Sequence, residues 1–250
     1  MIREVPGTFA NALVMGVRQA IDVDRARVQH DGYRKMLEDA GYEVTVLPGD
    51  STCPDSPFIE DAAVVLDNFA ILTRPGAPER QPEVPPVAEA LSGLMPTVEI
   101  KAPGTLDGGD VLRMGRTFFV GRSTRTNDAG IAQFAELAST DGMRVIATPL
   151  NGVLHLKTAV LGLDDETILI ASEFTDPRVF IGYRLVEKPP DEVTSSALRL
   201  HNGRVVVTAN TPLTMSAVAA AGFEVDWIDV TEFQKADGGL TCLSLLFPHT

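Results

Sequence analysis

Apolar residues recur along this chain as pairs of short runs separated by polar turns. In the segment 60–76, EDAAVVLDNFAILTRPG, Val/Ile/Leu-rich runs flank Asp67-Asn68, which predicts a β-hairpin. A helical pattern follows in PEVPPVAEALSGL, and an extended run follows that in TVEIKAPG. The predicted order is therefore strand, strand, helix, strand, which is a ββαβ unit.

The same order of runs returns along the chain. Further units open at 108–123 (GGDVLRMGRTFFVGRS), at 155–172 (HLKTAVLGLDDETILIAS) and, more weakly, at 202–211 (NGRVVVTANT). A last unit opens at 242–248 (CLSLLFP), where the chain runs out. Its missing strand, helix and strand can be supplied from the N-terminal segments NALVMGV, RVQHDGYRKMLEDAG and YEVTVLPG.

The spacing of these units favours a closed arrangement. Corresponding positions lie 48 residues apart from Asp61 to Gly109 and 47 apart from Gly109 to Leu156, and Cys242 follows 86 residues later, about two units on. Five ββαβ units would form a ring that hides strand edges. We therefore expect a single α/β domain over residues 1–250, with five pseudo-repeats and the last one completed by the N-terminus. An ordinary α/β sheet with hairpins is the alternative.

Charge and composition exclude some classes of function. The chain of 250 residues has 21 Lys and Arg against 34 Asp and Glu, a formal charge of −13. Such an acidic chain is not suited to binding nucleic acid or anionic membranes. No apolar run approaches the ~20 residues of a membrane span. Two cysteines form no CxxC pair and no zinc-binding spacing, which predicts a reduced, cytoplasmic protein with no structural metal site.

Polar residues stand where each predicted first strand begins. They are Glu60 and Asp61, Asp107 to Asp110, His155 with Lys157, and Thr241 with Cys242. A ring would bring them together in one central cleft, although Cys242 alone, in the apolar run LTCLSLLF, is more typical of a core residue.

A thiol, an imidazole and carboxylates together form the machinery of covalent catalysis. Several carboxylates would repel the oxyanion that develops from an ester or a peptide. They suit a reacting carbon inside a cation, and a planar guanidinium matches carboxylates in geometry and charge. A bound cation would also favour the thiolate of Cys242. These residues therefore indicate hydrolysis of a guanidino or amidino compound.

At these residues the chain resembles the dimethylarginine dimethylaminohydrolases, or dimethylargininases, of the pentein superfamily of guanidine-modifying enzymes. The matching stretches are DVDRARVQHDGY (22–33), PDSPFIEDAAVV (54–65), ILTRPGAPER (71–80), LDGGDVLRMGRTFFVGRSTRTN (106–127), LHLKTAV (154–160) and KADGGLTCLSLLF (235–247). The resemblance implies a five-bladed α/β propeller of ββαβ repeats. It also implies hydrolysis of Nω-methylated arginines to citrulline and methylamine or dimethylamine, without a cofactor.

The resemblance also implies a role for each matching residue. Cys242 is the expected nucleophile, His155 the general acid and base, and Asp107 the carboxylate that supports His155. Asp61 is expected to bind the guanidinium with Glu60 as a supporting acid. Asp55 is expected to contact the amino-acid end of the substrate or its neighbourhood, and Arg80 and Arg125 are expected at its α-carboxylate. Asp237 is expected to help hold the α-amino group, largely through its main chain, and the carbonyl group of Leu13 is expected to contact substrate.

Two other functions stay open at this point. A related hydrolase would act on arginine or another guanidino substrate, and a non-catalytic binding protein would use the same propeller. Whether the protein is a dimethylargininase or a related hydrolase, we expect its partner to be a small cationic amino acid. We also expect a monomer or a homodimer. We assign no role to His30, which we expect on an exposed helix surface.

Overall fold

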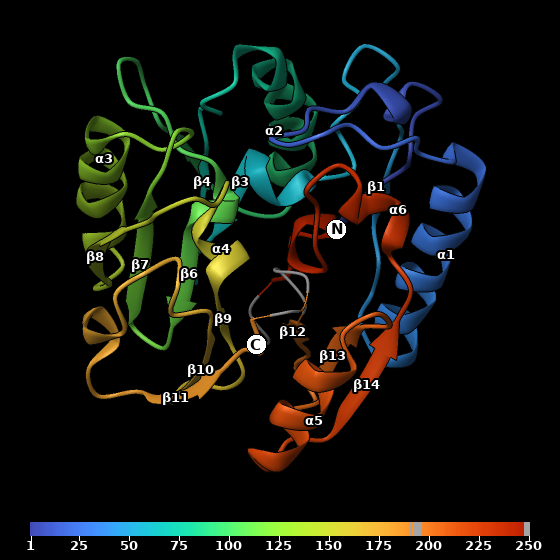
Figure 1. Ribbon diagram of the computed structural model, residues 1–250. Coiled ribbons are helices and arrows are strands. Elements are labelled where there is room, and N and C mark those ends of the chain that lie inside the picture. Colours follow the sequence, from blue (N-terminus) through green and yellow to red (C-terminus); the bar gives the residue numbers. More distant parts are fainter. Residues whose placement is uncertain (191, 193–196, 248–250) are drawn as a thin grey trace.

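The computed structural model describes residues 1–190, 192 and 197–247 and contains four three-stranded sheets of one design (Figure 1). In each sheet the first strand pairs antiparallel with the second, and the second pairs parallel with the third. The sheets are β3 (Ala63–Val65), β4 (Ala70–Leu72) and β5 (Thr97–Glu99); β6 (Val111–Met114), β7 (Thr117–Arg122) and β8 (Arg144–Pro149); β9 (Val160–Gly162), β10 (Thr167–Ile170) and β11 (Arg184–Glu187); and β12 (Ala197–Arg199), β13 (Val205–Thr208) and β14 (Val225–Ile228). The predicted α/β class is confirmed.

The two ends of the described chain contribute to a fifth sheet. β1 (Ile2–Arg3) pairs parallel with β2 (Val46–Leu47). Met1 donates from its N-terminal amine to the carbonyl of Leu245 at 2.8 Å, and the Leu245 amide donates back at 2.9 Å. This exchange gives Leu245 and β1 the antiparallel relation that the first two strands have in the other sheets.

One strand was expected in the wrong place. The segment 11–17, NALVMGV, is not a strand: the 3-10 turn η1 (Phe9–Asn11) precedes it, and Met15 and Val17 are largely exposed. The strand beside β2 is formed instead by Ile2 and Arg3, both of which are buried. Exposed apolar side chains in 11–17 leave that run without the buried face that stabilises a strand.

The longer helices lie toward the rim of the molecule, outside the sheets (Figure 1). The main ones are α1 (Val23–Asp39), α2 (Val84–Ser92), α3 (Asp128–Ser139) and α5 (Pro212–Ala220), and a short α6 (Thr231–Gln234) contacts α1. In the β9–β10–β11 sheet the crossover contains only the 3-10 turn η5 (Pro177–Phe180), so this unit departs from the expected ββαβ order. Within the described residues, no helix is both long and apolar enough to cross a membrane.

Aromatic side chains join helices to sheets in the core. Phe118 of β7 packs edge-on against Phe134 of α3, with ring centroids 5.2 Å apart. His30 of α1 also belongs to the interior, with 5% of its surface exposed and its ring 6.1 Å from that of Phe233. The expectation of an exposed His30 was wrong because the packing of α6 on α1 covers that helix face.

Short helical turns precede the first strands and gather near the centre of the fold. They are η2 (Ile59–Ala62), η4 (Gly108–Asp110), α4 (Leu156–Ala159) and, before Leu245, η6 (Thr241–Leu243). η2 contacts both η4 and η6, and α4 contacts η4. The approach is so close that a Cβ atom at Gly108 would lie 1.9 Å from the Glu60 carbonyl oxygen, so only glycine fits there. Polar residues far apart in sequence therefore meet.

Candidate active site

A small pocket brings together eight of the ten residues predicted from the sequence. These are Leu13, Asp55, Asp61, Arg80, Arg125, His155, Asp237 and Cys242. Asp107 contacts His155 from a fully buried position, and Glu60 lines a different cavity. The convergence follows from the helical turns, because Asp61 lies in η2, Cys242 lies in η6, and His155 caps α4.

Asp107 orients His155. A 2.9 Å hydrogen bond joins Asp107 Oδ2 to His155 Nε2, and the Gly76 amide donates to the other carboxylate oxygen at 2.8 Å. Burial opposes a charge on His155, but the carboxylates of Asp61, Asp107 and Asp110 outweigh it and raise the pKa of His155 to about 9. The imidazole is therefore an imidazolium near neutral pH, and one of its nitrogens is fixed by Asp107.

Asp110 supports the same histidine, although no separate role was predicted for it. It accepts hydrogen bonds from the Leu156 amide at 2.9 Å and from the Ser123 hydroxyl at 2.6 Å. Because Leu156 is the first residue of α4, Asp110 holds the turn that carries His155. Burial raises the pKa of Asp110 to about 6. The signal in the sequence was its place at the end of the Asp-Gly-Gly-Asp motif.

Asp61 lies between a backbone amide and an arginine. Its Oδ1 accepts from the Gly109 amide at 2.7 Å and lies 4.0 Å from His155 Nε2, and its Oδ2 accepts from Arg80 Nη1. Burial opposes the charge of Asp61, but the positive charges of His155 and Arg80 outweigh it and lower the pKa of Asp61 to about 2. Asp61 is therefore a permanent carboxylate.

Arg80 is held mainly by protein groups. Besides Asp61, its guanidinium donates to both carboxylate oxygens of Glu83, at 3.1 and 2.8 Å, and to the Phe58 carbonyl at 3.1 Å. Glu83 was missed from the sequence, where only its spacing of three residues from Arg80 marks it. The expected role of Arg80 at the substrate α-carboxylate stays a prediction, with most of its donors already engaged.

Arg125 has one hydrogen-bond donor that is available to a ligand. Its Nη1 is buried without a hydrogen-bond partner among the described residues and lies 3.8 Å from Asp107 Oδ2. An unpaired buried donor is costly, so it marks a place where a ligand can supply an acceptor. Arg125 is thus the better placed of the two arginines to receive a carboxylate.

The segment 13–15 covers the pocket through two carboxylates. The Leu13 amide lies 3.1 and 3.2 Å from the two oxygens of Asp55, and the Met15 amide donates to Asp237 Oδ2 at 2.6 Å. Asp237 has a left-handed backbone, with φ of 58°. One carboxylate oxygen of Asp237 therefore binds the segment 13–15, and the contact of its main chain with substrate stays a prediction.

Cys242 lies at the end of the pocket in η6. Its sulfur accepts from the Gly239 amide at 3.4 Å, and the hydroxyl of Tyr33 anchors the surrounding segment by donating to the Leu240 carbonyl at 2.9 Å. Burial, together with the negative charges of Glu60 and Asp61, raises the pKa of Cys242 to about 12. The resting pair is therefore a neutral thiol and an imidazolium.

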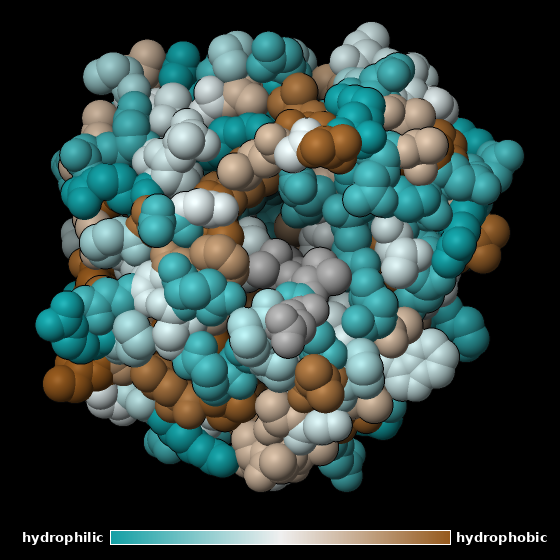
Figure 2. Space-filling model, in the orientation of Figure 1, coloured by the Kyte–Doolittle hydropathy of each residue, from teal (hydrophilic) through white to brown (hydrophobic). Residues whose placement is uncertain are grey.

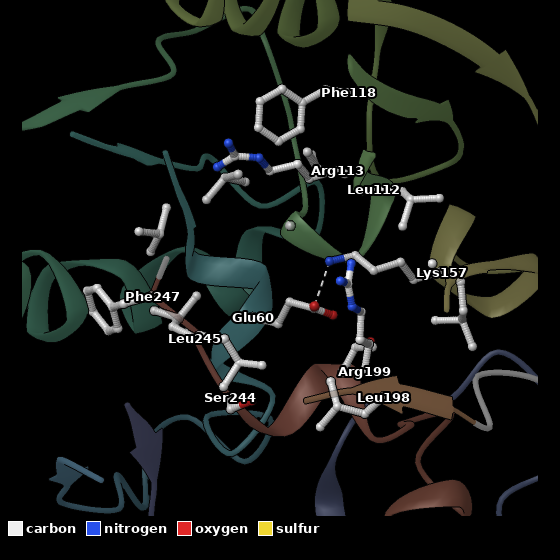
Figure 3. Close-up of a pocket in the computed structure, with 18 of the residues that line it drawn as sticks. Glu60, Leu112, Arg113, Phe118, Lys157, Leu198, Arg199, Ser244, Leu245 and Phe247 are labelled. Atoms are coloured by element: carbon white, nitrogen blue, oxygen red, sulfur yellow. Dashed lines mark hydrogen bonds and ion pairs between the residues drawn. The ribbon is translucent and has the colours of Figure 1, made fainter. Parts of the chain in front are cut away.

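Glu60 faces the other side of the central turns. Its carboxylate forms an ion pair of 2.5 Å with Lys157 in a cavity of about 660 Å³, which is also lined by Arg199 of β12 (Figure 3). Asp61 and His155 face the small pocket, whereas Glu60 and Lys157 face this larger cavity. Glu60 thus acts on the pocket only through its charge and its backbone. On the face shown in Figure 2, both hydrophilic and hydrophobic residues border a hollow near the centre.

Within the described residues, one group of side chains has the composition of a metal site. Ligand atoms of Asp61, Asp107 and His155 lie within 4.8 Å of one another. These atoms already satisfy each other and the Gly109 amide, so the group needs no metal ion to be stable. The absence of a metal stays a prediction. Cys53 and Cys242 are both free thiols.

Comparison with known proteins identifies the family. No protein-family model matches the chain. The N(G),N(G)-dimethylarginine dimethylaminohydrolase of Streptomyces coelicolor is 40% identical over 248 residues, covering 98% of this chain and 95% of that protein. The corresponding protein of Pseudomonas aeruginosa is 35% identical over 246 residues, covering 96% of this chain and 97% of its own.

The solved structures agree with these relatives. A cysteine-to-serine variant of the Pseudomonas aeruginosa enzyme, in complex with citrulline, superimposes with a TM-score of 0.93 at 31% identity and covers 97% of this chain and 96% of its own. The N-terminal domain of the cyanobacterial arginine dihydrolase ArgZ, at 18% identity and a TM-score of 0.86, shares the fold. With relatives this similar over almost its whole length, the chain belongs to the dimethylarginine dimethylaminohydrolase family of the pentein superfamily.

Proposed function

We propose that this protein hydrolyses mono- and asymmetric dimethylarginine to citrulline and methylamine or dimethylamine, with Cys242 as nucleophile. One observation carries the proposal: a single pocket contains the thiol of Cys242, the imidazole of His155 oriented by Asp107, and the permanent carboxylate of Asp61. Family membership and the citrulline complex of the Pseudomonas aeruginosa relative support the substrate class.

Binding of the cationic substrate activates the nucleophile. The carboxylates that raise the pKa of Cys242 are neutralised in part when Asp61 receives a guanidinium. The thiol of Cys242 then loses its proton to solvent more readily. The thiolate that results lies beside the guanidinium carbon of the bound substrate. The resting thiol is therefore less reactive than the thiol in the substrate complex.

The covalent step uses the proton that His155 already carries. The Cys242 thiolate forms a C–S bond to the guanidinium carbon, and the tetrahedral adduct collapses as His155 protonates the methylated nitrogen. The C–N bond breaks, the amine leaves, and a thiouronium remains on Cys242.

Hydrolysis reverses the role of His155. The neutral imidazole takes a proton from water, the oxygen adds to the thiouronium carbon, and the C–S bond breaks. The thiolate of Cys242 returns, the protonated urea group loses its proton, and citrulline leaves. Because Asp107 and Asp110 fix His155 in one place, the same ring serves both steps.

Arg125 favours a substrate that keeps its α-carboxylate. Its unpartnered Nη1 supplies the donor for that group, with Arg80 beside it in the pocket. Asp55, Asp237 and Leu13 surround the remaining amino-acid end. This charge counts against agmatine, and arginine remains the competing substrate within the same chemistry. We further propose that residues 1–250 act as one catalytic, cytoplasmic domain without nucleic-acid or membrane partners.

A citrulline-release assay across arginine, monomethylarginine and dimethylarginine tests the proposal. We expect turnover of the two methylated substrates and at least about tenfold lower kcat/KM for arginine. Cys242→Ser is expected to abolish turnover without unfolding the protein. Retained turnover in that variant would refute the nucleophile. A protein that binds methylarginine and releases no citrulline would instead be the non-catalytic binding protein left open above.

A further inference from the structure

Arg80 places a positive charge in a pocket proposed to bind a cation. Its Nη1 donates to Asp61, the carboxylate that would hold the substrate guanidinium. In a buried site, an arginine on its own would neutralise Asp61 and repel the substrate. Recognition of a guanidinium therefore requires a further negative charge close to Arg80.

Glu83 supplies that charge from outside the pocket. Its two carboxylate oxygens accept from Nε and Nη2 of Arg80, at 3.1 and 2.8 Å, which is the strong two-point arrangement of an arginine and a carboxylate. The side chains of Arg80 and Glu83 are 5% and 3% exposed, so water screens this pair little. With all three groups ionised, Glu83, Arg80 and Asp61 have a net charge of −1, whereas Arg80 and Asp61 alone have none.

The local backbone keeps this arrangement in place. Arg80 and Glu83 lie three residues apart in the 3-10 turn η3 (Pro78–Glu83), where proline rings restrict the chain. The buried Arg3 of β1 donates from Nη1 to the Glu83 carbonyl at 3.3 Å. Glu83 itself does not line the pocket, so any effect on substrate passes through Arg80.

We propose that Glu83 is a positioning residue that neutralises Arg80, so that the charge of Asp61 remains available to the substrate guanidinium. The inference rests on the proposed function and adds to it the source of selectivity for a cation. When Glu83 loses its charge, the full charge of Arg80 acts on Asp61 and neutralises it. The pocket then binds a guanidinium or amidinium more weakly. Reaction of Cys242 with a neutral reagent does not depend on this charge.

Two alkylating reagents separate these effects in Glu83→Gln. Chloroacetamidine is a planar cation without an amino-acid end, and iodoacetamide is neutral. At pH 8.5 Glu83 is ionised in the unsubstituted protein, because burial raises its pKa only to about 7. We expect chloroacetamidine to inactivate Glu83→Gln about tenfold more slowly, with KM for dimethylarginine raised about tenfold and the iodoacetamide rate within about twofold. Glu79→Gln, at an exposed position in the same turn, is the matched control and is expected to change none of these rates.

A double variant tests the charge balance directly. Arg80→Gln with Glu83→Gln removes one charge of each sign, so that Arg80 no longer competes for Asp61, while His155, 4.0 Å from Asp61, is unchanged. The chloroacetamidine rate is then expected to return to within about threefold of the unsubstituted protein. Thermal unfolding of each variant reports whether it folds. If the double variant does not fold, the ratio of the chloroacetamidine and iodoacetamide rates in Glu83→Gln tests the role of Glu83.

The outcomes separate the two proposals. Equal slowing of both reagents in Glu83→Gln, or no slowing of chloroacetamidine, would overturn the role of Glu83 and leave the hydrolase intact. If the unsubstituted protein reacts equally with both reagents, without protection by dimethylarginine, the proposed function itself fails.

Discussion

A single methyl group at Gly109 is predicted to disable the site. A Cβ atom there would lie 2.6 Å from Nδ1 of His155 and 2.9 Å from Oδ1 of Asp61, whereas ordinary van der Waals contacts begin near 3.4 Å. The imidazole would have to move by about 0.8 Å and the carboxylate by about 0.5 Å, taken as the differences between these distances. Displacements of this size in a preorganised site cost roughly 10²-fold in rate.

The expected result for Gly109→Ala is therefore a fall in kcat/KM of about 10² for dimethylarginine, with a stability loss of about 1–3 kcal/mol from overpacking. Citrulline release measures the first quantity, and denaturant unfolding measures the second. Gly93→Ala is the control, because the nearest atom to its added Cβ, apart from close chain neighbours, is 4.0 Å away. Activity within about threefold of the unsubstituted protein in Gly109→Ala would refute the claim that Gly109, His155 and Asp61 are in tight contact.

Three further predictions concern the titration of Cys242, the titration of His30 and the hold of Asp110 on His155. Iodoacetamide should alkylate Cys242 at a rate that still rises above pH 10, since the pKa of the thiol is about 12, and a plateau near pH 8 would contradict this. Burial lowers the pKa of His30 to about 4, so its contribution to stability is complete above the unfolded value of 6.5 and is lost as the pH falls from there to about 4. His30→Leu should remove up to about 3 kcal/mol of that acid sensitivity, measured by urea unfolding at pH 7 and pH 4, and an unchanged pH dependence would show that His30 titrates normally. Asp110→Asn should lower kcat about tenfold with little change in KM, because it loosens the turn that holds His155, and a change confined to KM would refute that role.

The repeat pattern explains why the central residues of the site could be predicted from the sequence, whereas the residues expected at the amino-acid end of the substrate came from the family resemblance. Asp61, Asp107, His155 and Cys242 each lie in or beside the short turn that precedes a first strand, so one register placed all of them near the centre. The period of apolar runs alone predicts this convergence, without the rotamer of any side chain.

The remaining features depend on contacts that no periodicity records. Glu83 lies outside the repeated position, and its importance comes from the way a proline-rich turn presents it to Arg80. The two-residue strand β1 is too short to show alternation. The buried face of His30 depends on α6, about 200 residues later. Glu60 and Asp61 are adjacent in sequence yet face different cavities.

The reciprocal backbone bonds between Met1 and Leu245 also have a consequence for biosynthesis. These partners are 244 positions apart, so at 5–20 residues per second a ribosome needs roughly 10–50 s to supply the second after the first. Throughout that interval β1 lacks its backbone partner Leu245, and Cys242 has not yet been synthesised for most of it. A nascent chain therefore acquires Cys242 and the backbone partner of β1 within a few residues of each other, and a chain terminated before Cys242 lacks both.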